Sequence, residues 1–271
     1  MNKLIRLDRL SLCLIGLGLL FSCNEKAADS SDGYELVWSD EFDEDSVNLD
    51  NWSFVLWDAG RVNNEWQKYV EDTAYYKLED GKLQIKAVKT GENEKGGYTS
   101  TRLNSAGKKE FKYGRIEFRA KMPQGRGTWP ALWMLGSNHD SIRWPKCGEI
   151  DIMEYVGYAP DTTHNNVHTK YQYGVTDFHG TIPTPTAEEE FHNYGMTWTS
   201  DSIKFYLDTP DNVTNVYAPE VKTEDNWPFD QPFYLIMNFA VGGAWGGKHG
   251  VDDSVFPQEM VVDYVRVYQL K

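Results

Sequence analysis

Three carboxylate side chains lie close together in one apolar stretch of the sequence, and their types and spacing suit them to chemistry. Glu149, Asp151 and Glu154 alternate with isoleucine and methionine in Gly148–Tyr155. Burying a carboxylate is costly unless a partner or a reaction uses it. Two carboxylates that flank a glycosidic bond can hydrolyse it. The pattern therefore favours glycoside hydrolysis over two alternatives, a solvated strand face and a calcium site.

The spacing of these acids also predicts an irregular strand. Side chains of a strand alternate between its two faces, so Glu149 and Asp151 share one face, and the isoleucine between them points to the core. Glu154 follows Glu149 at an odd spacing and would face the core in a regular strand. One extra residue at Ile152 or Met153, a β-bulge, would return Glu154 to the face of the other acids. We therefore expect a bulge at this place.

Tryptophans near the acids could hold a sugar ring, because an indole face stacks on the apolar face of a pyranose. Trp129 and Trp133 lie four residues apart and would share one face of a strand. The alternative for this pair is packing in the core. Trp245 lies in the glycine-rich segment Gly242–Gly247, where a large side chain is hard to bury. We expect all three to contact substrate.

The elements that must position these residues read as strands. Short alternating or apolar runs bounded by turn residues are Lys82–Val88, Tyr113–Lys121, Glu149–Tyr155, Ser202–Leu207, Phe233–Val241 and Val261–Tyr268. No long segment has the period of an amphipathic helix. Many strands without intervening helices predict an all-β fold, with two antiparallel sheets packed as a sandwich or jelly roll around a concave substrate cleft. One domain over residues 34–271 accounts for this pattern.

The acid motif and three further segments resemble glycoside hydrolase family 16. Its signature E-[ILV]-D-x-x-E is matched by Glu149, Asp151 and Glu154, and the other matching segments are Trp38–Phe42, Trp129–Gly136 and Val262–Tyr268. The extra methionine before the second glutamate is similar to the laminarinase branch, the endo-β-1,3-glucanases. The resemblance implies a concanavalin-like jelly roll. It also implies that Glu149 is the nucleophile, Glu154 the general acid and then base, and Asp151 the residue that tunes the pair.

The same resemblance implies roles for residues away from the acids. Asn63 and Arg102 match segments that hydrogen-bond sugar hydroxyls, and the segment of Trp245 resembles a loop at the edge of the cleft. His168 belongs to a strand that the resemblance places beside the acids, where it could orient Glu154.

A calcium ion is a further expectation from the resemblance, because family members often carry one on the convex face. The matching ligands are Glu41, Asp263 and a backbone carbonyl near Gly81, all of which offer the oxygen atoms that calcium prefers. The alternative is an edge held by salt bridges. Catalysis itself is expected to need no cofactor.

Composition excludes some classes of partner. The 271 residues hold 27 Lys and Arg against 41 Asp and Glu, a formal net charge of −14, and no basic cluster that could bind nucleic acid. Ten Trp, 16 Tyr and 12 Phe favour flat apolar ligands such as sugar rings. Cys147 stays alone in the domain, so no disulfide framework is expected.

Residues 1–22 read as a lipoprotein signal peptide. Basic residues precede the apolar stretch Leu10–Phe21, which is shorter than a membrane span. Leu20–Cys23 resembles a bacterial lipobox, which implies a lipid on Cys23. Residues 23–33 are polar and read as a tether. We expect export and lipid anchoring to a bacterial membrane, the outer membrane in particular; the alternative is a secreted or periplasmic protein.

These observations together predict a monomeric, retaining endo-β-1,3-glucanase that acts on laminarin-type β-glucans. Two alternatives stay open. The same fold could cleave another glycan, such as mixed-linkage glucan or agar and other galactans. It could also be a non-catalytic glycan-binding lectin, since fold does not imply function. A lectin would have no use for the pair Glu149 and Glu154.

Overall fold

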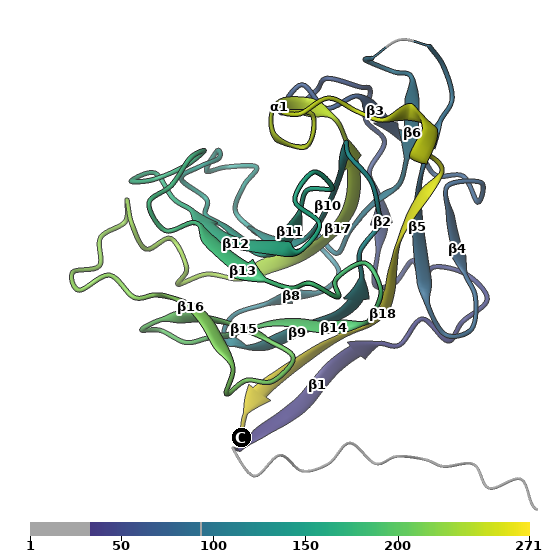
Figure 1. Ribbon diagram of the computed structural model, residues 1–271. Coiled ribbons are helices and arrows are strands. Elements are labelled where there is room, and N and C mark those ends of the chain that lie inside the picture. Colours follow the sequence, from purple (N-terminus) through teal and green to yellow (C-terminus); the bar gives the residue numbers. More distant parts are fainter. Residues whose placement is uncertain (1–32, 93) are drawn as a thin grey trace, which may run out of the picture.

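The protein is described by a computed structural model over residues 33–92 and 94–271, and its regular structure is almost entirely β-strand (Figure 1). Within these residues, the strands of the larger sheet, sheet A, are β1 (Tyr34–Asp40), β3 (Gln67–Tyr69), β4 (Tyr76–Leu78), β5 (Leu83–Lys89), β6 (Tyr98–Ser100), β9 (Gly114–Lys121), β14 (His192–Trp198), β15 (Ile203–Leu207), β16 (Val213–Tyr217) and β18 (Gln258–Leu270). The strands of sheet B are β2 (Ser53–Phe54), β7 (Arg102–Asn104), β8 (Glu110–Phe111), β10 (Thr128–Gly136), β11 (Glu149–Tyr155), β12 (Thr162–His168), β13 (Gly180–Pro183) and β17 (Phe233–Val241).

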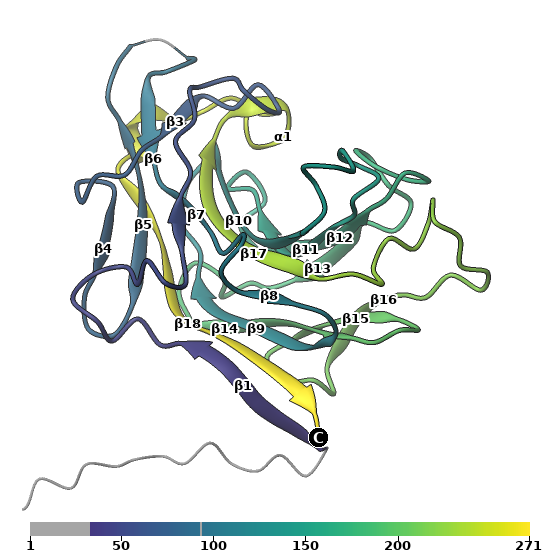
Figure 2. The ribbon, with the colours of Figure 1, turned by 180° about the vertical axis from the view of Figure 1, so that it is seen from behind.

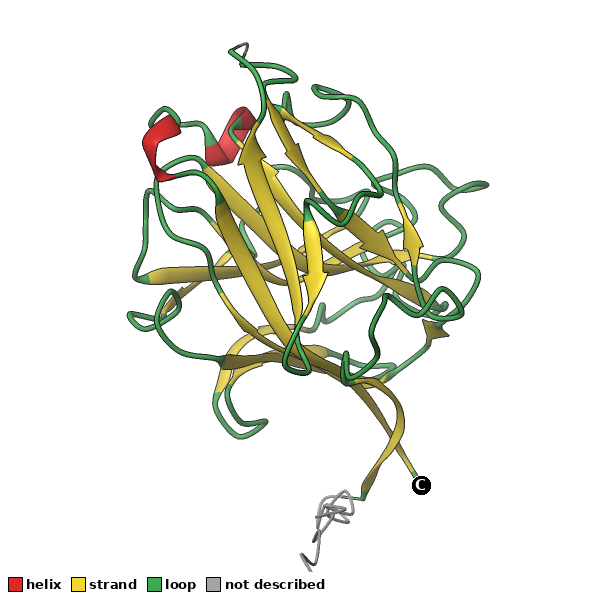
Figure 3. Cartoon of the chain, turned by 90° about the vertical axis from the view of Figure 1, so that its right-hand side faces the viewer, coloured by secondary structure: helices red, strands yellow, loops and turns green. Residues whose placement is uncertain are grey.

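The two sheets are stacked and curved (Figures 1 and 2). Sheet A has the order β16-β15-β14-β9-β18-β5-β6-β3, with β1 on β18 and β4 on β5, and sheet B has the order β13-β12-β11-β10-β17-β7-β2, with β8 on β17. Paired strands are antiparallel except β3 and β6. Figure 3 shows the helical turns α1 (Gly243–Gly246) and η1 (Asp253–Val255) at one end of the sandwich. The predicted all-β, two-sheet architecture is confirmed.

A single large core fills the space between the sheets. Sheet B contributes side chains with no exposed surface from β10 and β11, namely Leu132, Met134, Ile150 and Met153. Sheet A contributes equally buried residues from β9 and β18, namely Ile116, Phe118, Val265 and Val267. Burial of each such side chain stabilises the fold by about 1.5–3 kcal/mol. The alternate residues of sheet B are left on its other face, where the acids lie.

Strand β11 carries the predicted bulge. Trp133 of β10 lies opposite Asp151, whereas the residue before Trp133 lies opposite Met153, so Ile152 is the extra residue. The pairing with β12 shifts at the same place, between Asp151 and Glu154. Ile152 and Met153 are both buried in the core, and Glu154 returns to the face of Asp151. The expectation of an irregular strand is confirmed.

The predicted strands match the structure closely. Each of the six predicted runs coincides with one strand, and β11 and β17 match at both ends. The first and last strands of the described residues pair with each other, from Tyr34 opposite Leu270 to Asp40 opposite Val265. The predicted signal peptide, Cys23 and most of the tether lie outside the described residues. In the described part of the chain, the helical turns are too short to span a membrane.

We expect the bulge to depend on its buried anchor. Met153→Ala should lower the free energy of unfolding by about 2–5 kcal/mol, because it leaves a cavity beneath β11. Chemical denaturation measures this, with Val175→Ala as the control, since Val175 is fully exposed. A loss for Met153→Ala no larger than that of the control would contradict the packing described here.

Candidate active site

The face of sheet B that points away from the core gathers the three acids and a histidine. Glu149 of β11 lies opposite His168 of β12. The Nε2 atom of His168 lies 3.2 Å from Oδ2 of Asp151 and 3.6 Å from Oε1 of Glu149. His168 was predicted to orient Glu154, but the register places it beside the other two acids. The structure thus links His168 to Glu149 and Asp151.

Glu154 has a different partner, the indole of Trp129. The Nε1 atom of Trp129 donates a hydrogen bond of 3.0 Å to Oε1 of Glu154. Both side chains are half-buried, so the carboxyl keeps access to a ligand. Sequence reasoning expected Trp129 to stack on sugar; the structure gives its N–H group a direct contact with an acid.

Burial dominates the electrostatics of the acids. It raises the pKa of Glu149, Asp151 and Glu154, each to about 8. At Glu149 the charge of Asp151 adds to this rise, while His168 and Arg102 oppose it. At Glu154 Asp151 again adds to the rise in pKa, and the hydrogen bond from Trp129 opposes it. Burial therefore favours the protonated form of these carboxyls, while the positive charges of His168 and Arg102 favour ionisation of Glu149 within the trio.

Next to the acids, a second cluster combines aromatic and polar groups. The guanidinium carbon of Arg102 lies 4.8 Å from the ring centre of Trp133 and 4.4 Å from that of Trp57. Trp133 donates from Nε1 to Oδ1 of Asn238 at 2.7 Å, and Nδ2 of Asn238 donates to the hydroxyl of Tyr69 at 3.1 Å. Half-buried Trp133 therefore presents part of its ring beside Asp151, its cross-strand neighbour.

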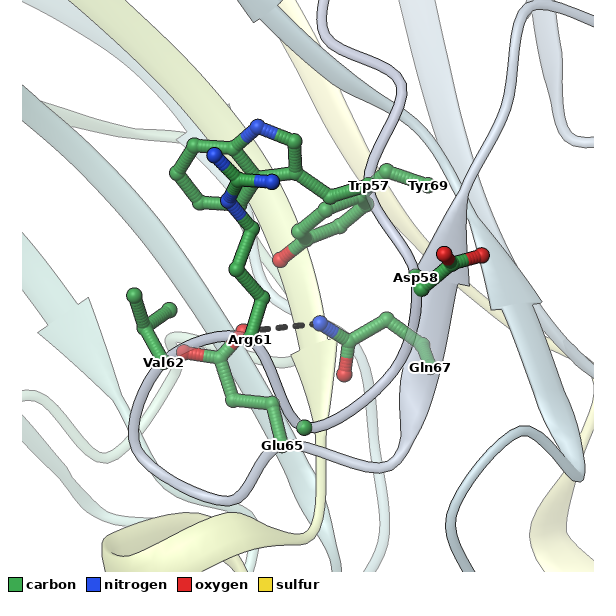
Figure 4. A pocket seen from close by; sticks show the side chains of 8 residues that line it. Trp57, Asp58, Arg61, Val62, Glu65, Gln67 and Tyr69 are labelled. Atoms are coloured by element: carbon green, nitrogen blue, oxygen red, sulfur yellow. Dashed lines mark hydrogen bonds between the residues drawn. The ribbon is translucent and has the colours of Figure 1, made fainter.

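A pocket continues from this cluster, with Trp57, Glu65 and Gln67 in its lining, and Asn63 contacts it through Glu65 (Figure 4). The Nδ2 atom of Asn63 donates to Oε1 of Glu65 at 3.2 Å, and Nε2 of Gln67 donates to Oε2 of Glu65 at 2.8 Å. Gln67 also accepts from the backbone N–H of Val241 at 2.7 Å, which ties the pocket to the end of β17. Figure 4 shows the hydrogen bond between Gln67 and Glu65 and, beside it, the guanidinium of Arg61, which lies 4.8 Å from the ring centre of Trp57.

Trp245 lies in α1, beside Trp129, the partner of Glu154. The loop reaches this position through Gly242 and Gly243, whose φ angles of 68° and 77° favour glycine. A side chain at Gly242 would also collide with Trp66, because an added Cβ would lie 2.6 Å from that ring. The half-buried Trp245 ring contacts Trp129 edge to face at 5.6 Å between ring centres. The predicted place of Trp245 beside the acids stays consistent with substrate contact.

The predicted calcium ligands do not fit an ion. Both carboxylate oxygens of Glu41 accept from Arg266, at 2.9 and 2.8 Å, and Asp263 accepts from Arg119 at 2.6 Å. Each acid is thus neutralised by its own arginine, which is the salt-bridged alternative. An added Cβ at Gly81 would meet the carboxylate of Asp43 at 2.8 Å, so the Gly81 turn lies against another acid.

The described residues contain one group of three side chains with metal-ligating atoms within 4.8 Å of one another, Glu149, Asp151 and His168. These are residues of the acid cluster itself.

Cys147, which precedes them, is free and buried, and burial raises the pKa of its thiol to about 12. It therefore stays protonated, as a structural thiol does.

Sequence reasoning missed several polar residues of this face. Asn238 is a polar residue in the middle of the apolar strand β17. Its polarity and its place in the alternation of that strand could have predicted that it faces the acids. Trp57 carried no such signal, because it lies in a loop whose path depends on tertiary contacts. His179 was likewise missed; it comes close to β12 only through the loop before β13.

Comparison with known proteins identifies close relatives. Residues 58–266 match the family described as Glycosyl hydrolases family 16. The beta-glucanase of Rhodothermus marinus is 44% identical over 266 residues, which cover 93% of this chain and 92% of that protein. The crystal structure of a laminarinase from Flavobacterium sp. UMI-01 is similar with a TM-score of 0.80 and 45% identity, covering 87% of this chain and 100% of that one. The laminarinase structure from Rhodothermus marinus has a TM-score of 0.82 and 43% identity, and the match covers 88% of this chain and 98% of that one.

The raised pKa of Asp151 predicts a pH-dependent cost to stability. The folded state holds this proton up to about pH 8, whereas the unfolded chain releases it near its ordinary pKa of 3.8, so stability is lost as pH rises between these values. Asp151→Asn cannot ionise. Its free energy of unfolding should equal that of the wild type near pH 4 and exceed it by several kcal/mol at pH 8, since each unit of difference in pKa corresponds to ~1.4 kcal/mol. Denaturation at several pH values measures this, with exposed Asp45→Asn as the control. A difference that shrinks with rising pH would refute the assignment.

The arginine pairs of Glu41 and Asp263 predict that no calcium is needed. We expect EDTA to leave the melting temperature unchanged within 1 °C, roughly the effect of a few tenths of a kcal/mol. Differential scanning calorimetry with and without added calcium measures this. A fall of several degrees in EDTA that calcium restores would show that an ion displaces the arginines.

Proposed function

The chain belongs to glycosyl hydrolase family 16, and we propose that it is a retaining endo-β-1,3-glucanase for laminarin-type β-glucans. The observation that carries the proposal is the position of Glu149, Asp151 and Glu154 on one accessible face of sheet B, made possible by the bulge at Ile152. Relatives named beta-glucanase and laminarinase, at 43–45% identity over most of their length, supply the substrate class.

The first step forms a covalent glycosyl-enzyme. An ionised oxygen of Glu149 attacks the anomeric carbon, and the bond from that carbon to the glycosidic oxygen breaks. Glu154 gives its proton to the departing oxygen, so the reducing-end fragment leaves as an alcohol. Glu149 is then an ester and carries no charge.

The second step hydrolyses this ester. Because Glu149 has lost its charge and Glu154 is now ionised, Glu154 can accept a proton from water. The water oxygen attacks the anomeric carbon, the bond to Glu149 breaks, and Glu149 leaves as a carboxylate. Two inversions at one carbon retain the β configuration, and Glu154 ends the cycle protonated.

The surroundings of the two glutamates fit these different roles. Arg102 and His168 favour the charged form of Glu149, which the attack requires. Burial keeps the proton on Glu154, while the N–H of Trp129 can stabilise Glu154 once it has lost that proton. Asp151 lies between them in sequence and contacts His168, so it acts as the group that tunes their charges.

A neutral glucan suits the rest of the site. Trp133 offers an aromatic face, and Asn63, Glu65 and Asn238 offer hydrogen-bonding groups of the kind that bind hydroxyls. Arg102 is buried between two indoles rather than presented as a free cation for sulfate. The retained acid pair distinguishes this site from a lectin.

The proposal extends to the cellular setting. We propose that the domain is exported, anchored through a lipid on Cys23 to the bacterial outer membrane, and monomeric. The support for export and anchoring is the sequence pattern of residues 1–33. Metabolic labelling with a fatty acid would detect the lipid, and Cys23→Ser should abolish the label.

Azide tests the roles of the two glutamates. Glu154→Ala should lose about 10²–10⁴-fold in activity on laminarin. With an aryl β-laminaribioside, whose leaving group needs no acid, azide should restore turnover and give the β-glycosyl azide, because it attacks the ester on Glu149. Glu149→Ala should give no hydrolysis, and any azide product should have the α configuration. Product anomers are read by NMR.

Opposite anomers for the two variants would exchange the roles of Glu149 and Glu154.

Incubation of the wild type with laminarin, lichenan and agarose in parallel tests the substrate. We expect release of β-1,3-linked oligosaccharides from laminarin. Release from agarose alone would make the enzyme a galactanase, and release from none with retained laminarin binding would make it a lectin.

A further inference from the structure

Two histidines beside the general acid are not used by the mechanism above. His164 of β12 lies directly opposite Glu154 of β11. The Nδ1 atom of His164 lies 2.8 Å from Nε2 of His179, so the two imidazoles share a hydrogen bond. His164 is 9% exposed, whereas His179 is exposed at the surface. The pair thus leads from solvent to the neighbourhood of Glu154.

The ring of Trp245 covers this pair. Its centre lies 5.0 Å from that of His164 and 5.7 Å from that of His179, in edge contacts. The same indole touches Trp129, which donates to Glu154. One indole and two imidazoles therefore gather on the Glu154 side of the acids.

One polar atom of this cluster has no partner. The Nε2 atom of His164 is buried without a hydrogen-bond partner among the described residues. An unmade bond of this kind costs about 1–3 kcal/mol, so such atoms normally have an occupant when the protein acts. A ligand hydroxyl would satisfy it.

The hydrogen bond within the pair sets its binding chemistry. Burial lowers the pKa of both imidazoles, that of His164 to about 4, so both are neutral at neutral pH. In a neutral pair one ring donates to the other. Whichever ring donates, the remaining two nitrogens are one donor and one acceptor. That combination matches sugar hydroxyls, and it lacks the positive charge that sulfated or acidic sugars require.

The position of the pair assigns the sugar that it binds. The general acid must touch the glycosidic oxygen, so the leaving group lies on the Glu154 side. We propose that His164 and His179, under the ring of Trp245, bind the hydroxyls of the leaving-group glucose, the first sugar on the reducing-end side of the cleaved bond. This inference rests on the proposed function and makes the pair a specificity determinant for that sugar.

Leaving groups with and without hydroxyls test the inference. His179→Phe keeps an aromatic ring against Trp245 but removes both nitrogens. It should lower kcat/KM for laminaripentaose about tenfold, because hydrogen bonds to the leaving sugar are lost. It should leave kcat/KM for a 4-methylumbelliferyl β-laminaribioside within twofold, because that leaving group has no hydroxyls for the pair. His164→Leu should act in the same way, and His139→Ala, in the loop after β10, is the control with a partly exposed histidine.

Transfer to an acceptor gives a second readout. An acceptor sugar occupies the leaving-group site, so His179→Phe should raise the KM of laminaribiose as acceptor about tenfold while hydrolysis of the aryl substrate continues. This readout stays available if His164→Leu fails to fold, since His179 lies at the surface.

The outcomes separate this inference from the proposed function. An equal loss on both substrates would mean that the pair only supports the fold, and no loss on either would mean that it does not bind the sugar; both results overturn the inference. A wild type that cleaves neither substrate would reject the proposed function itself.

Discussion

The active site depends on one extra residue in β11. A regular strand would send Glu154 into the core with Ile150, where an acid could neither meet a sugar nor exchange a proton with water. Because Ile152 has no partner of its own across β10, the strand turns Glu154 back to the face of Glu149 and Asp151. The bulge costs no apolar burial, since Ile152 and Met153 both enter the core. The sandwich thus holds a catalytic geometry with the same contacts that stabilise it.

Placing three acids together in a partly dry groove is unfavourable for stability. The same burial raises the pKa values of the acids, which the reaction requires. Burial keeps protons on carboxyls at a pH where free carboxylic acids have lost them. Small differences in surroundings then give the two glutamates different roles. Arg102 and His168 favour the charged form of the nucleophile Glu149, and Trp129 donates a hydrogen bond to the general acid Glu154. The fold tolerates this because the large core between the two sheets supplies the stabilisation.

Much of this arrangement could be predicted from the sequence, because it follows from alternation along single strands. The parity of the acids predicted the bulge, and the parity of Trp129 and Trp133 predicted that both lie on one face of a strand. The contacts that could not be predicted depend on pairing between neighbouring strands or on the path of loops. The partner of His168 was set by its register with Glu149, and the pair of His164 with His179 by a loop. The arginines that pair with the expected calcium ligands, Arg119 and Arg266, were not foreseen, because no local pattern connects them to Asp263 and Glu41.

Trapping of the glycosyl-enzyme tests the central claim most directly. A 2-deoxy-2-fluoro-β-laminaribiosyl fluoride slows both steps but keeps an activated leaving group, so the ester accumulates and peptide mass spectrometry locates it. The account predicts one sugar adduct per protein, on the peptide with Gly148–Tyr155 and on Glu149 within it. An adduct on Glu154, or unimpaired binding of the reagent without any adduct, would contradict the geometry that the bulge provides.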